Sequence, residues 1–101
     1  MKIALQIAGM PNGDATPIDG KYLKSFDFEY CNGLGRGVFT DNPEEAMTFP
    51  SQGAAIFYYR TQPKCRPYRD DGMPNRPLTA TNVTFLDLVH FGLLEEQDER
   101  R

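Results

Sequence analysis

The sequence predicts a small α+β domain, with one main helix on one face of a small, mostly antiparallel sheet. A chain of 101 residues accommodates a single domain with one modest core. Apolar and polar side chains alternate over residues 2–7, as in a half-buried strand, whereas residues 51–62 carry apolar side chains at helical spacing. We therefore expect one domain over residues 1–94, in the order β-β-β-α-β, and a charged, disordered tail over residues 95–101.

Two further strands follow the first one. Residues 22–30 alternate aromatic and polar side chains. Leu23 falls out of step with Phe26 in this alternation, and a bulge near Lys24 would place both on one face. The glycine-rich residues 32–37 predict a turn, because glycine adopts the positive φ angles that such turns need. Residues 38–40 would then return as the third strand of a hairpin.

Asn42 and Ser51 each predict a helix start. Asn42 can cap the backbone, with Pro43 in the first helical position and Glu45 completing a capping box. This helix must be short, because the next proline disfavours helical geometry in the residue before it. Ser51 begins the main helix, which we expect to continue to about residue 62. The expected inward face comprises Ala54, Ala55, Phe57, Tyr58 and Thr61.

The remaining residues predict a long proline-rich loop and a last strand. Residues 63–77 hold four prolines and an Asp-Gly pair, and a connection of this length in a compact domain is often functional. Residues 79–89 read as the last strand. Its apolar side chains alternate onto both faces, which predicts a central position in the sheet.

Charge is spread unevenly along the chain. Residues 60–76 hold five Lys or Arg and two Asp, a net +3, so the rest of the chain must carry −6 to give the total of −3. This balance argues against coating of nucleic acid and favours local docking of an acidic partner. Neither a secretory signal nor a transmembrane segment is visible, so we expect a cytoplasmic protein with no membrane partner.

Catalytic and metal sites are not predicted. The two cysteines and the one histidine have spacings unrelated to those of zinc sites, so we expect no metal and no cofactor. Cys31 and Cys65 are expected to remain thiols, with Cys31 buried as a small hydrophobic residue. Asp27 and Glu29 share a strand face and could form an acid/base pair, which an enzyme would use together with His90, but alternation of this kind is typical of a solvated strand face.

The strongest functional prediction is the segment over residues 58–76, which interleaves tyrosine with arginine. Arginine binds carboxylate or phosphate in two-point fashion, and tyrosine packs on partners or stacks on bases. Three interpretations remain open: a solvated loop held by Arg60 or Arg66 on Asp70 and Asp71, a protein-binding surface, or a nucleic-acid-binding surface. The predicted partner-binding residues are Tyr59, Arg60, Arg66, Tyr68, Arg69 and Arg76.

Two further expectations concern this segment. The tetrapeptide Gly-Met-Pro-Asn occurs at residues 9–12 and again at residues 72–75. If the two copies lie together, the loop over residues 10–18 adds to the same surface. Arg76 could instead be a buried anchor whose guanidinium binds carbonyl groups of the loop.

The chain also resembles a family of small uncharacterised proteins from bacteriophages and prophages. The resemblance rests on residues 20–29, 33–40, 42–46 with Phe49, and 66–80. It implies a bacterial host cell as the setting, with a host or phage protein as partner, and no known activity. We therefore expect a non-enzymatic protein that acts by protein–protein contact, for example by inhibiting a host-defence or nucleic-acid-handling complex. The alternatives are a nucleic-acid-binding accessory protein and a phage assembly or structural accessory protein.

Overall fold

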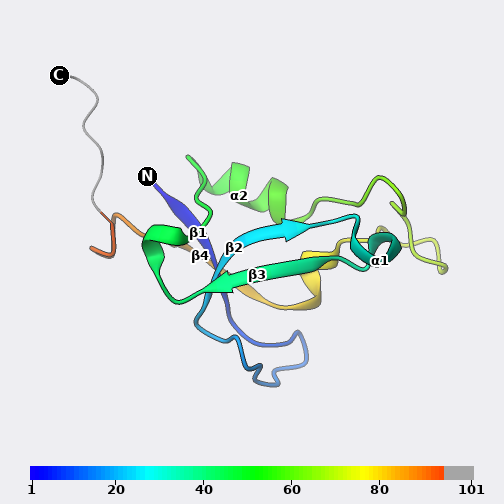
Figure 1. Cartoon of the computed structure of the whole chain (residues 1–101), viewed down its shortest axis with the longest axis horizontal. Coiled ribbons are helices and arrows are strands. Elements are labelled where there is room, and N and C mark those ends of the chain that lie inside the picture. Colours follow the sequence, from blue (N-terminus) through cyan, green and yellow to red (C-terminus); the bar gives the residue numbers. More distant parts are fainter. Residues whose placement is uncertain (95–101) are drawn as a thin grey trace.

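A computed structural model describes residues 1–94 and confirms the α+β class. Four antiparallel strands form a sheet in the order β3-β2-β1-β4, and helix α2 lies over one face of it (Figure 1). The tail predicted at residues 95–101 lies outside the described residues. The elements are β1 (Ile3–Ile7), β2 (Tyr22–Asp27), the short turn α1 (Tyr30–Gly33), β3 (Arg36–Thr40), α2 (Gln52–Tyr59) and β4 (Val83–Asp87).

Strand β1 lies in the interior of the sheet. It pairs with β4 from Ile3 opposite Asp87 to Ile7 opposite Val83, and with β2 on its other side. The predicted alternation holds, because Ile3, Leu5 and Ile7 are buried, and Ile3 and Leu5 share a cluster with Ala55 of α2. Ala4 on the opposite face is also fully buried, in a second small cluster. A central strand thus has both faces covered.

Strand β4 is an edge strand, so the central position predicted for it is wrong. It is also shorter than predicted, because the residues before it form a 3-10 helix, Pro77–Ala80. The apolar side chains of β4 still serve two clusters. Phe85 faces the ring of Tyr59 on the α2 side, at 5.7 Å between ring centroids, and Leu86 packs beside Leu88 on the other. Coverage of both faces, and not centrality, explains the sequence pattern.

The β2–β3 hairpin forms as predicted, and the register shift between Leu23 and Ser25 confirms the bulge at Lys24. Strand β2 ends at Asp27, earlier than predicted. The chain then reverses through α1, where Cys31 and Asn32 have φ angles of 50° and 58°. These left-handed conformations make the reversal sharp. The resulting turn is the platform for the candidate site.

Both predicted caps are present. The Asn42 side chain accepts from the Glu44 backbone N–H at 3.0 Å and begins a 3-10 helix, Pro43–Glu45. Ser51 Oγ accepts from the Ala54 backbone N–H at 3.1 Å and begins α2. Glu45 does not complete a capping box, because its carboxylate accepts instead from the Thr40 hydroxyl at 2.9 Å.

Helix α2 ends at Tyr59, sooner than predicted, and one of the side chains predicted to face inward faces solvent. Ala55 is fully buried, and Tyr58 and Tyr59 are half-buried against the sheet. Phe57 is 81% exposed, so the inward position predicted for it is wrong. None of the helices within residues 1–94 has the length and apolar content needed to cross a bilayer.

The core beneath α2 extends into the base of the loop that follows. Rings of Phe28 and Phe49 contact Tyr58 at centroid distances of 5.3 and 5.2 Å, which joins α2 to the hairpin. Pro63, the first residue of the long loop, is among the largest fully buried side chains. The loop therefore leaves the core from a fixed point.

Candidate functional site

The arginine loop, residues 63–76, lies beside the turn of the β2–β3 hairpin at one end of the molecule. Figure 1 shows this yellow-green segment next to α1, far from the amino terminus. The loop has no helix or strand of its own beyond one isolated bridge. Its position must therefore be fixed by individual contacts, and the side chains of Glu29 and Asn75 supply those to the hairpin turn.

Glu29 holds the start of the arginine loop. Its carboxylate accepts from the backbone N–H groups of Lys64 at 2.9 Å and Cys65 at 2.8 Å. The interaction of the Cys65 side chain with this carboxylate, together with these two backbone hydrogen bonds, holds the pKa of Glu29 below its ordinary value. In return, the hydrogen bond to Glu29 raises the pKa of the Cys65 thiol. Cys65 is therefore protonated at neutral pH.

Asn75 holds the end of the arginine loop. Its Nδ2 donates to the carbonyl of Gly33 at 2.9 Å and to the carbonyl of Arg66 at 3.0 Å, so it ties the loop to α1 and to itself. Gly33 permits this approach. A Cβ at that position would lie 2.9 Å from the Arg66 Cβ, and its φ of +93° already disfavours other residues.

The tip of the arginine loop is a small hairpin. Tyr68 and Pro74 form an antiparallel bridge, and the Arg69 backbone N–H donates to the Met73 carbonyl at 2.8 Å. Arg69 and Asn75 both line the cavity described next, whereas Tyr68 does not.

Three arginines converge on one cavity of about 430 Å³, which we call the cationic cavity. Arg66 and Arg69 come from the arginine loop, and Arg76 stands where the loop joins the 3-10 helix Pro77–Ala80. Other lining residues are Cys31, Gly33, Leu34, Asn75, Pro77 and Ala80. Guanidinium groups gathered in this way attract an anion.

The positive charge of the cationic cavity is only weakly balanced. Arg66 pairs with Asp70 at 2.8 Å, as one of the three interpretations predicted, but the Asp70 side chain is 98% exposed. Exposed pairs of this kind are easily exchanged for another anion. Arg69 and Arg76 form no ion pair within the part of the chain that the structure describes.

Arg76 is partly buried, yet its guanidinium does not bind loop carbonyls, so the anchor role predicted for it is wrong. Its Nε is buried and lacks a hydrogen-bond partner among residues 1–94. The backbone carbonyl of Arg76 accepts from Thr79 Oγ1 at 2.7 Å, within the 3-10 helix that follows the loop. A buried donor without a partner is costly.

The other predicted binding residues are placed differently. Tyr59 packs inward against Phe85, and its hydroxyl donates to the Thr81 carbonyl at 2.7 Å, so this tyrosine is structural and not a surface anchor. Arg60 is exposed and lines a second cavity, described below. Tyr68 is 59% exposed but lines neither cavity.

The two copies of Gly-Met-Pro-Asn do not lie together. Residues 72–75 belong to the tip of the arginine loop, whereas residues 9–12 belong to the blue loop beneath the sheet in Figure 1. The loop that holds residues 9–12 is instead fixed to the residue before β4, because the Asn82 backbone N–H donates to the Gly9 carbonyl at 2.8 Å. The loop over residues 10–18 is therefore not part of this surface.

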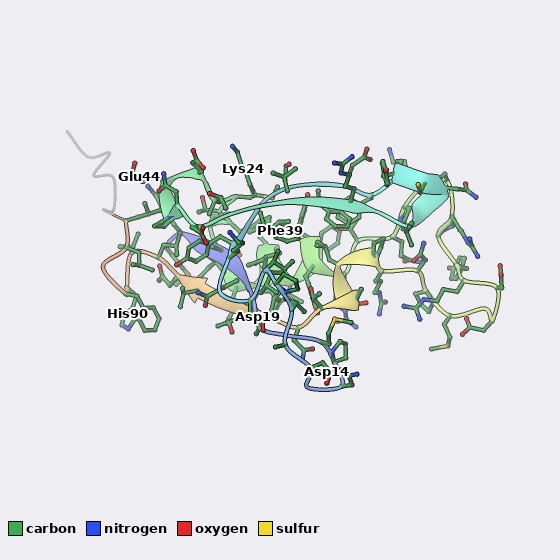
Figure 2. The ribbon with its side chains drawn as sticks, turned by 60° about the horizontal axis from the view of Figure 1, so that its bottom comes forward. Asp14, Asp19, Lys24, Phe39, Glu44 and His90 are labelled. Atoms are coloured by element: carbon green, nitrogen blue, oxygen red, sulfur yellow. The ribbon has the colours of Figure 1, made fainter. Side chains whose placement is uncertain are left out.

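The side chains considered for catalysis do not converge. Glu29 is occupied by the arginine loop, and the Asp27 carboxylate accepts from the Glu29 backbone N–H at 3.0 Å. His90 lies at the opposite end of the molecule, beside Phe91 (Figure 2). Cys31 is exposed on the wall of the cationic cavity, so the buried position predicted for it is wrong. Residues 1–94 contain no group of three metal-ligating side chains.

Sequence reasoning missed Glu29, Gly33 and Asn75 as residues that build the site. Glu29 was assigned to a strand face, although it contacts residues 35 positions later. Only Gly33 carried a local signal, since it belongs to a glycine-rich turn. The contact partner of each residue is set by the fold.

Comparison with protein-family models, with curated proteins and with solved structures finds no match to this chain. The arrangement of the site must therefore support any functional conclusion on its own.

Proposed function

We propose that this protein is a small, non-enzymatic binding domain that acts by protein–protein contact and accepts an acidic segment of its partner in the cationic cavity. One observation carries the proposal: Arg66, Arg69 and Arg76 line a single cavity, and none of them has a buried acidic partner in the described chain. A carboxylate would accept charge-assisted hydrogen bonds from them.

The size of the cavity and the charge around it favour a protein carboxylate over nucleic acid. A volume of about 430 Å³ suits a few side-chain-sized groups and not a long phosphate backbone. The rest of the chain carries −6, which repels a polyanion that extends beyond the cavity. Leu34 and Met73, exposed by 72% and 59%, add apolar area near the arginines, as is common at protein interfaces.

The resemblance to bacteriophage proteins adds a setting to the proposal. The partner would be a host or phage protein in the bacterial cytoplasm, and blocking of a host-defence or nucleic-acid-handling complex is one such role. This setting depends on the resemblance alone. The acidic-segment proposal does not depend on it.

A titration with a defined anionic peptide tests the binding class. The ¹⁵N-labelled protein is titrated at low salt with acetyl-tetraglutamate amide, and separately with a short oligothymidine. We expect the peptide to shift the side-chain N–H signals of Arg66, Arg69 and Arg76, and the shifts to weaken as salt is added. The double variant Arg69→Ala/Arg76→Ala should lose this response.

The matched control is Lys21→Ala/Lys24→Ala, which removes the same charge from another part of the surface (Figure 2 shows Lys24 on the side of β2 away from the arginine loop). This control should bind the peptide as the parent does. An equal loss in both double variants would reduce the effect to net charge and overturn the proposal. Tighter binding of the oligothymidine than of the peptide would assign the cavity to nucleic acid instead.

A further inference from the structure

A second cavity, of about 580 Å³, lies along the exposed side of α2. It is lined by Gly53, Ile56, Phe57, Arg60, Thr61, Gln62 and Arg76. Phe57 is 81% exposed, more than any other large hydrophobic residue within residues 1–94. Ile56, also on its wall, is 37% exposed. Solvent-exposed apolar side chains on the wall of a cavity are available to contact a binding partner.

Arg76 is the residue that the two cavities share. The two cavities therefore adjoin at this residue. A single extended segment that crosses Arg76 would reach both of them. Arg60 and Arg76 at the second cavity disfavour a cationic occupant, and the exposed Phe57 and Ile56 give its wall an apolar part that an apolar side chain can cover.

We infer that the second cavity binds one apolar side chain, aromatic or long aliphatic, of the same segment whose carboxylate enters the cationic cavity. This inference rests on the proposed function and makes it more specific. The recognised segment combines an acidic group with an apolar side chain a few residues away. The carboxylate supplies charge complementarity, and the apolar side chain supplies burial against Phe57.

Linked peptides test the inference directly. The probes are acetyl-Glu-Glu-(Gly)n-Phe amides and acetyl-Phe-(Gly)n-Glu-Glu amides, with the number of glycines varied from none to about three because a linker must match the span. Each has a matched peptide in which Phe is replaced by Gly. Affinity is measured by NMR titration of the labelled full chain.

We expect at least one linked peptide to bind about tenfold or more tightly than its Gly-matched peptide, and to shift signals of both Arg69 and Phe57. Phe57→Ser should remove this gain while leaving the affinity of the Gly-matched peptide unchanged. Because Phe57 is mostly exposed, this substitution leaves the core intact. Phe91→Ser, at the far end of the molecule and 62% exposed in the parent, is the matched control and should retain the gain.

The outcomes separate the two proposals. If every linked peptide binds no better than its Gly-matched peptide, the second cavity does not take an apolar side chain, and the inference is wrong while the cationic cavity stands. If neither set of peptides shifts the arginine signals, the proposed function itself fails. A gain that survives in Phe57→Ser would place the apolar contact elsewhere and also overturn the inference.

Discussion

The Glu29 carboxylate accepts a hydrogen bond from the Cys65 backbone N–H at 2.8 Å, and the Cys65 side chain interacts with the same carboxylate. This pair connects the end of the β2–β3 hairpin to the start of the arginine loop across 36 residues of sequence. It is one of the contacts that place Arg66 at the cationic cavity. Its chemistry gives the first two predictions.

Replacement of Glu29 should make Cys65 more reactive. The hydrogen bond to the carboxylate and its negative charge raise the pKa of the thiol, so Glu29→Gln should lower that pKa and increase the thiolate fraction at neutral pH. The measurement is the rate of alkylation by iodoacetamide in a Cys31→Ser background. Asp27→Asn, which changes the neighbouring carboxylate, serves as the control and should have a smaller effect. An unchanged rate in Glu29→Gln would contradict the contact.

Acid should release the start of the arginine loop. The pKa of Glu29 is lower in the folded than in the unfolded protein, so its contribution to the free energy of unfolding is fully present above the unfolded-state pKa, about 4.3. The contribution is lost as the pH falls through the lower folded-state pKa. The difference in free energy of unfolding between the parent and Glu29→Gln should therefore shrink in that window. A difference that stays constant down to the lowest pH would refute this assignment.

Gly33→Ala should destabilise the protein more than Gly13→Ala. Both glycines have positive φ, +93° and +94°, so both substitutions cost roughly 1 kcal/mol of backbone strain. Only at Gly33 would the new Cβ meet another group, the Arg66 Cβ at 2.9 Å, whereas nothing lies within 4 Å at Gly13. We expect a further loss of about 1–3 kcal/mol from overpacking. Denaturant unfolding of the two variants measures this difference. Equal losses in the free energy of unfolding would show that Gly33 is needed only for its positive φ angle and not for the close approach of Arg66.

Tyr59→Phe should lower the free energy of unfolding by about 1 kcal/mol, because it removes the hydrogen bond to the Thr81 carbonyl. Tyr58→Phe is the matched control. Its ring is also half-buried against the core, but its hydroxyl has no hydrogen bond among residues 1–94. Thermal unfolding measures both changes. Peptide binding should be the same in both variants, and weaker binding in Tyr59→Phe alone would restore a direct binding role to that residue.

Local patterns in the sequence predicted much of the fold. The caps at Asn42 and Ser51, the bulge at Lys24 and the strand predicted at residues 2–7 each depend on groups a few residues apart, and all are present, the strand over Ile3–Ile7. The edge position of β4 was not predictable, because coverage of both faces by other elements gives the same sequence pattern as a central strand. The exposure of Phe57 was missed for a related reason: in a helix as short as α2, apolar spacing alone does not fix which side chains face inward.

The sequence by itself determined the α+β class and the concentration of positive charge in residues 60–76, since both follow from composition and short-range pattern. Only the tertiary structure decided which arginines act together. Arg66, Arg69 and Arg76 share a cavity because contacts such as those of Glu29 and Asn75 fix the loop on the hairpin. Contacts between residues far apart in the chain depend on packing and register, which no short segment of sequence specifies.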